Sequence, residues 1–403
     1  MNSKAFKLNF YAFLWHSIFL ALSSNFMNID TIIPSLLIKA GGSNFQLGIL
    51  TAILVGLSPF AQLFFGPILA PYKSKKIYLL LGIYIRILSL LALSFLLFKS
   101  ITTGENIILI LFIIISLFTL SGGFAGIAYT DILGKAIRPN ERKKFFSLRQ
   151  TITSLGLLIS SIAVKKVLTI FNFPKNYGYL FFIAFLLLLI ASSGFWVIRE
   201  PESKIKNKTS RLNLLKLLPV YLKKDSNLFN YLLSINFFNF FISILPFFLM
   251  FLKTKQPITG KVLGNLLVAK ILGMTIGGLL IHYFFKKTNY KSLLLMIIPL
   301  GIILPIIAFL TVKILFLYIL VFFFIGIFFA FFAVANSGIL IEISNEINRP
   351  IYTGLAGAGN IVGIIYPLLV GLLVKWIGFF PIFVFASVML GFSLIFIKKI
   401  HCK

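Results

Sequence analysis

The chain has 403 residues, of which 59% are hydrophobic and 12% are charged. Soluble domains are about 45–50% apolar and about 25% charged, so this composition predicts an integral membrane protein and excludes an ordinary soluble domain. The formal net charge of +29 does not indicate nucleic-acid binding, because we find no soluble basic domain that would carry it.

Apolar runs of membrane-spanning length follow one another along the whole chain. A bilayer core about 30 Å thick needs roughly 20 apolar residues in a helix. Runs such as "FFIAFLLLLIASSGFWVI" do not alternate as barrel strands do, so we predict an all-α protein. Twelve helices are expected, at about 10–38, 46–70, 77–98, 107–133, 144–169, 178–198, 229–252, 260–286, 290–310, 314–341, 350–374 and 378–397.

A polar, basic segment at 199–228 divides these helices six plus six. We therefore predict a six-helix bundle at 1–198, a central loop at 199–228 and a second six-helix bundle at 229–403. Of the 38 Lys and Arg residues, 26 fall on the side of the N-terminus and 10 on the other side. This asymmetry predicts cytoplasmic termini, with the basic loops facing anionic lipid headgroups. We expect a monomer in a bacterial inner membrane.

Two stretches recur at matching places in the two halves. "DILGKAIRP" begins at Asp131, at the end of the fourth span, and "EISNEINRP" begins at Glu342, at the end of the tenth. "GPILAPYKSKKIYLLLG" from Gly66 and "GLLIHYFFKKTNYKSLLL" from Gly278 likewise follow the second and eighth spans. These repeats indicate two related halves, an arrangement known in transporters that hold substrate near the membrane midplane.

In these features the chain resembles the major facilitator superfamily. The basic turn after the second span matches the family signature G-x-x-x-A-D-R-x-G-R-K at Gly66, Ala70, Lys75 and Lys76, with Pro71 and Ser74 departing from it. The stretch "NIDTIIPSLL" is similar to the family's L-D-x-T-I…P signature at Asp30, Thr31 and Pro34. The resemblance implies two pseudo-symmetric six-helix bundles and secondary transport by alternating access.

Lys270 is the strongest candidate for a substrate contact. It falls inside the eighth span and shares a helix face with Gly273 and Gly277. Charges inside a membrane span are costly and usually face a protein interior. Lys270 is therefore expected to bind an anionic group or to titrate, and a structural pair with a carboxylate is the alternative.

Amide and hydroxyl side chains inside the spans form a second set of candidates. The resemblance implies that spans 1, 5 and 7 line the cavity. Interhelical hydrogen bonding is the alternative role, because polar side chains also join helices in membranes. The candidate substrate contacts are Asn25, Asn28, Gln62, Tyr129, Gln150, Asn236, Asn239, Asn336 and Asn360.

Charged residues near span ends are candidates for coupling and gating. Asp30 is expected to couple protons or to pair in an outer gate, and a solvated interfacial acid is the alternative. The repeated acid-to-Arg spacing at the inner ends predicts that Asp131 and Glu342 pair with basic residues of the opposite turns when the inside is closed. Ordinary loop-end charges are the alternative. The gating candidates are Lys75, Lys76, Asp131, Arg138, Arg149, Glu342 and Arg349.

No reactive cluster, phosphate loop or cysteine pair indicates an enzyme, a metal or a cofactor. We expect a secondary transporter for a small solute, with an organic anion favoured by Lys270 and proton coupling by Asp30. A multidrug or lipophilic efflux transporter and a non-transporting receptor on the same fold are the alternatives. Span 11 has Gly359, Gly363, Pro367 and Gly371 at four-residue steps, which predicts a closely packed helix.

Overall fold

The fold is described from a computed structural model, which describes residues 3–69, 72–99, 105–138, 141–201, 222–285, 287–344, 352, 355–357 and 360–401. These residues form helices and no β-strand. Twelve segments among them are long and apolar enough to span a membrane. The prediction of an all-α, twelve-span protein is therefore confirmed, and its largest boundary error is at the first span, expected from residue 10 and found from Lys4.

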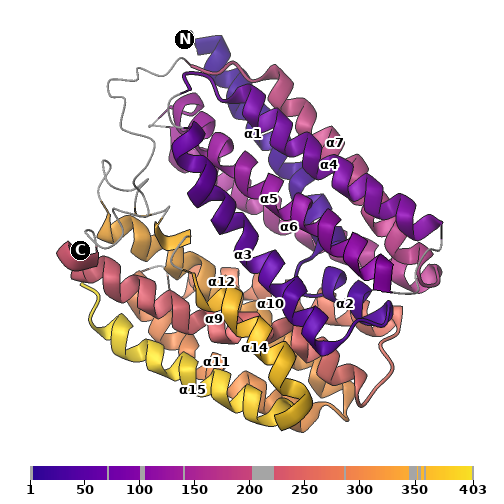
Figure 1. The fold of residues 1–403 in the computed structure, drawn as a ribbon. Helices are drawn as coiled ribbons and strands as arrows, with labels where there is room; N and C mark the ends of the chain where they lie inside the picture. Colours follow the sequence, from indigo (N-terminus) through magenta and orange to yellow (C-terminus); the bar gives the residue numbers. More distant parts are fainter. Residues whose placement is uncertain are drawn as a thin grey trace. The chain divides into compact units, whose positions relative to one another are not determined.

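Figure 1 shows the helices, coloured from indigo at the N-terminus to yellow at the C-terminus. The first half contains α1 (Ser3–Ser24), η1 (Asn25–Met27), α2 (Ile32–Lys39), α3 (Asn44–Leu69), α4 (Lys76–Phe98), α5 (Glu105–Ala136), α6 (Arg142–Ile170) and α7 (Lys175–Val197). The second half contains α9 (Ser226–Lys253), α10 (Gly260–Tyr283), α11 (Tyr290–Thr311), α12 (Leu315–Ile343), α14 (Val362–Ile377) and α15 (Phe379–Lys398).

The first span is interrupted, which the sequence-based prediction of one helix did not include. The α-helix ends at Ser24, continues as the short η1 and restarts at Ile32. Asn28 explains the restart, because its Oδ1 accepts hydrogen bonds from the N–H groups of Asp30 and Thr31, each at 3.1 Å. Asparagine side chains that bond nearby backbone groups compete with helical hydrogen bonds in this way.

The chain forms two compact units. The first contains Met1–Leu36 and Leu57–Leu212, and the second contains Leu37–Gly56 and Asn213–Lys403. The sequence-based division keeps residues 1–198 together, whereas the contacts place the start of α3 with the second half. Glycines permit this contact: a Cβ atom on Gly48 would lie 2.4 Å from the Pro367 carbonyl oxygen. The described residues of the glycine ridge in span 11 are thus closely packed, and Gly359 lies outside them.

The same helix pairs recur in the two units. In the first unit α4 packs on α5 and α7, and α1 packs on α6 and α7. In the second unit α11 packs on α12 and α15, and α9 packs on α14 and α15. In span order these are the same pairs shifted by six, which supports the internal repeat inferred from the sequence.

Candidate functional site

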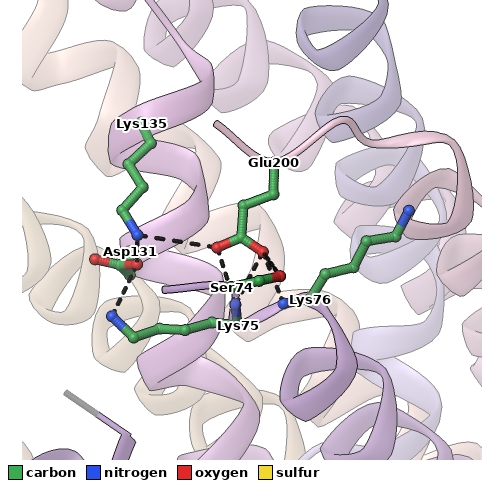
Figure 2. Close-up of polar contacts among 6 residues, drawn as sticks. All are labelled: Ser74, Lys75, Lys76, Asp131, Lys135 and Glu200. Carbon is green, nitrogen blue, oxygen red and sulfur yellow. Dashed lines mark hydrogen bonds and ion pairs between the residues drawn. The ribbon is translucent and has the colours of Figure 1, made fainter. Parts of the chain in front are cut away.

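A network of charged groups joins three segments of the first unit (Figure 2). Its centre is Glu200, which follows α7. The Glu200 carboxylate accepts hydrogen bonds from the Ser74 hydroxyl at 2.8 Å and from the backbone N–H groups of Lys75 and Lys76 at 2.9 Å. Glu200 thereby satisfies N–H groups at the start of α4, where no residue of that helix provides a side-chain cap.

Asp131 lies beside Glu200 near the end of α5. Its Oδ2 atom is 2.9 Å from Lys75 Nζ, and it also pairs with Lys135 one helical turn later. Lys135 Nζ is 3.9 Å from Glu200 Oε1, so the two acids share a cation (Figure 2). We name the group of Ser74, Lys75, Lys76, Asp131, Lys135 and Glu200 the Glu200 network.

The structure brings some of the gating candidates together and leaves others apart. Asp131 pairs with Lys75, while the Lys76 ammonium donates to the carbonyl oxygens of Trp196 and Ile198. Arg138 stacks on the Phe6 ring, with its Cζ atom 4.5 Å from the ring centroid. Arg149 forms no salt bridge within the described residues.

The corresponding end of the second unit shows no matching ion pair among its described residues. Glu342 Oε2 is buried and accepts no hydrogen bond there. Arg349 lies outside the described residues, so the pairing expected near it is not tested. Glu200 is a site residue that the sequence-based prediction missed. Its only signal in the sequence is its place as an acid directly after the sixth span.

Three candidate asparagines line one hollow in the second unit. This hollow has a volume of about 280 Å³ and is lined by residues of α9, α12 and the chain just before α14. Its polar lining is Tyr231, Asn239, Asn336 and Asn360, and its apolar lining includes Phe332. We name it the asparagine hollow.

The hydrogen bonding in the asparagine hollow leaves groups available to a ligand. Asn336 Oδ1 is buried and has no hydrogen-bond partner in the described residues. The Asn239 amide donates to the Ile235 carbonyl of its own helix at 2.9 Å, and the Tyr231 hydroxyl lies 3.3 Å from the Asn336 carbonyl oxygen. A buried acceptor without a partner is costly, so a donor on a bound solute would stabilise the site.

A second, smaller hollow lies in the first unit. It has a volume of about 80 Å³ and is lined by Ser17, Leu20, Ala21, Ser24, Arg149 and Thr153. Arg149 also lies over the ring of Tyr129, with its Cζ atom 5.8 Å from the centroid. We name it the Arg149 hollow.

Several amide candidates hold the fold together in this structure. Asn25 is fully buried and donates to the Leu157 carbonyl at 2.7 Å and to Ser160 Oγ at 3.0 Å, which joins η1 to α6. Asn28 caps the chain before α2. Asn236 Oδ1 accepts the Val362 N–H at 3.1 Å, at the start of α14.

The remaining candidates line neither hollow. Lys270 is 4% exposed, and its Nζ atom is 4.7 Å from the centroid of the Phe329 ring. Gln62 and Asp30 are half-buried, and Gln150 is exposed. No group of three or more His, Cys, Asp or Glu side chains is placed to hold a metal ion within the described part of the chain.

A protein-family model described as Major Facilitator Superfamily matches residues 15–320. The fold is similar to that of a POT family transporter in complex with a thioalcohol-conjugated peptide, with 12% identity, 96% of this chain and 95% of that chain covered, and a TM-score of 0.73. The nucleoside transporter NupG is 16% identical, with 98% of each chain covered and a TM-score of 0.67.

A bacterial homolog of the human lysosomal transporter Spinster is also similar. It is 13% identical, with 98% of this chain and 97% of that chain covered and a TM-score of 0.58. No curated protein sequence matches the chain. At these identities the similarity to solved structures shows a shared fold.

Proposed function

This chain belongs to the major facilitator superfamily of secondary transporters, and we propose that it moves a small polar solute by alternating access. In this mechanism the solute shifts the populations of conformations open to either side of the membrane. The energy comes from an ion or solute gradient, and the energetic coupling is to protons through Asp30.

The asparagine hollow is the observation that carries this proposal. Amide side chains both donate and accept hydrogen bonds, and Asn336 Oδ1 is buried without a partner among the described residues. Apolar walls with a few placed polar groups are typical of small-molecule sites, whose volumes are about 300–1,000 Å³. The hollow of about 280 Å³ is just below the lower end of that range.

The Glu200 network is the proposed inner gate of the first unit. Its ions join the start of α4, the end of α5 and the chain after α7, so separation of these segments must break charged hydrogen bonds. Glu342 and Arg349 are the proposed gate residues of the second unit. We further propose cytoplasmic termini, from the distribution of Lys and Arg. We also propose a monomeric state and a bacterial inner membrane.

The proposal is tested by the thermal stability of the purified protein against a solute library at two pH values. A ligand of the folded state raises apparent stability by RT ln(1 + [L]/Kd). We expect a polar solute to raise the melting temperature of the wild type and to lose this effect in Asn336→Leu. The matched control is Asn265→Leu, which changes a half-buried asparagine of α10 that does not line the hollow.

The two alternative functions give different results in this experiment. Responses to lipophilic cations alone would indicate an efflux transporter. The absence of any response, together with an interior closed to water-soluble labels, would indicate a receptor-like protein on the same fold. A pH-dependent response that disappears in Asp30→Asn would support proton coupling.

A further inference from the structure

We propose that Arg149 binds an oxyanion group of the transported solute, a carboxylate or a phosphate, in the hollow of the first unit. This inference rests on the proposed transport function and adds the chemical class of the solute. It assigns the anion contact to Arg149, which the sequence suggested as a gating residue, in place of Lys270.

The lining of the Arg149 hollow is suited to an oxyanion. Arg149 and Thr153 are one helical turn apart on α6 and line the same space. Ser17 and Ser24 reach this space from α1. The hollow therefore joins one guanidinium group and three hydroxyl groups, and a guanidinium matches the planar, bidentate geometry of carboxylate and phosphate.

Arg149 has no carboxylate counter-ion among the described residues. Within the part of the chain that the structure describes, no carboxylate lies within salt-bridge distance of Arg149. Asp131 is paired with Lys75 and Lys135 instead. Arg149 is half-buried at the start of its apolar span, and an anionic group of the solute is the partner that we propose for its guanidinium.

The nearby groups increase the positive character of this region. Arg86 and Arg149 are both close enough to His16 to act on it electrostatically. The Arg86 side chain packs on the Phe118 ring, with its Cζ atom 4.3 Å from the centroid, and its buried Nε has no hydrogen-bond partner among the described residues. Positive charges near a cleft with low-dielectric walls raise the local concentration of anions.

Hydrogen-bond donors are available around Arg149. The Tyr129 hydroxyl is buried beside the Ser17 hydroxyl. Ser17 and Ser24 donate to the carbonyl oxygens of Phe13 and Leu20 in their own helix. A serine hydroxyl can rotate about its Cβ–Oγ bond, so both can donate to a bound oxyanion instead.

The volume of the Arg149 hollow limits what it can hold. Sites for whole small molecules have volumes of about 300–1,000 Å³, whereas this hollow has about 80 Å³. It therefore fits the charged group of a solute rather than a complete organic molecule.

The test compares matched anionic and neutral probes on the purified full-length protein. Succinate is paired with succinamide, and glycerol 3-phosphate with glycerol, with inorganic phosphate as a third anion. We expect at least one anion, but not its neutral partner, to raise the melting temperature of the wild type. Arg149→Gln should raise the Kd of that anion at least tenfold, and Arg149→Lys should keep part of the affinity.

Three further variants test whether the loss of anion binding is specific to the Arg149 hollow. Lys166→Gln removes an exposed cation of the same helix and should leave anion binding unchanged. Thr153→Val should weaken anion binding even if Arg149→Gln fails to fold. Lys270→Gln should retain anion binding. If Lys270→Gln loses anion binding and Arg149→Gln retains it, Arg149 is not the anion contact.

The outcomes also separate this inference from the transport function. Binding and transport of neutral solutes alone, or no response of the wild type to any anion, would overturn the role of Arg149 and leave transport standing. A failure to transport any solute that binds would overturn the proposed function itself.

Discussion

Both carboxylate oxygens of Glu200 lie 2.9 Å from the backbone nitrogen of Lys75 and accept its N–H. This contact joins residues that are 125 positions apart in the chain. It places a negative charge at the positive end of the α4 dipole, where an anion is stabilising. The N-terminus of α4 is thus capped by Glu200, which follows α7.

We expect Glu200→Ala to lower the stability of the protein in detergent. The substitution leaves partly buried N–H groups at the start of α4 without a protein acceptor, which costs up to about 1–3 kcal/mol. The measurement is the melting temperature of the variant beside that of Glu141→Ala, an acid with no ion pair in the described residues. Equal melting temperatures for the two variants would show that the cap contributes nothing.

Asp131→Asn should alter transport much more than stability. The Asp131 side chain is 31% exposed, and ion pairs near the surface contribute about 0–1 kcal/mol. A gate residue nevertheless changes the balance between inward-open and outward-open states. The measurement is transport rate and melting temperature for Asp131→Asn, Lys75→Gln and the double variant. Non-additive effects on rate are expected for the pair, and additive effects would argue against a shared role.

Gly273→Ala should destabilise the second unit. A Cβ atom at Gly273 would lie 1.9 Å from the Phe323 carbonyl oxygen on α12. Forcing an atom into such a contact typically costs about 1–3 kcal/mol. Gly278→Ala is the control on the same helix, because a Cβ atom there meets nothing within 4 Å. Equal melting temperatures for the two variants would contradict the close packing of Gly273 against Phe323.

Asn25→Ala should weaken the junction between η1 and α6. The variant loses the hydrogen bonds to Leu157 and Ser160, and interhelical hydrogen bonds in membranes contribute about 1 kcal/mol. Gln150→Ala changes an exposed amide of α6 and serves as the control. A lower melting temperature in Asn25→Ala with unchanged solute affinity would identify Asn25 as a structural residue. A loss of solute affinity with an unchanged melting temperature would identify Asn25 as a binding residue.

The sequence predicted the fold well because the length of an apolar helix and the repeat of short motifs are local signals. The twelve spans follow from such signals. The break at Asn25–Thr31 was missed because the sequence reads as one apolar run. It does not show that the Asn28 side chain accepts the N–H groups of Asp30 and Thr31. Glu200 was missed because its role depends on where α7 ends relative to α4.

The candidate site was predicted less completely than the fold. Asn239, Asn336 and Asn360 were expected to contact substrate, and they meet in one hollow. Asn25 and Asn236 have the same side-chain chemistry, yet they bond the backbone of neighbouring segments. Residue type alone does not separate a ligand contact from a structural hydrogen bond, because both need the same polar groups.

The central claim is that this chain carries a polar solute across a membrane, and counterflow measures this directly. Purified protein is placed in liposomes preloaded with an unlabelled solute that raises its melting temperature, and uptake of the labelled solute is followed. We predict rapid accumulation that is absent from protein-free liposomes and reduced in Asn336→Leu. Binding without any accumulation in the wild type would contradict transport and favour a receptor-like role.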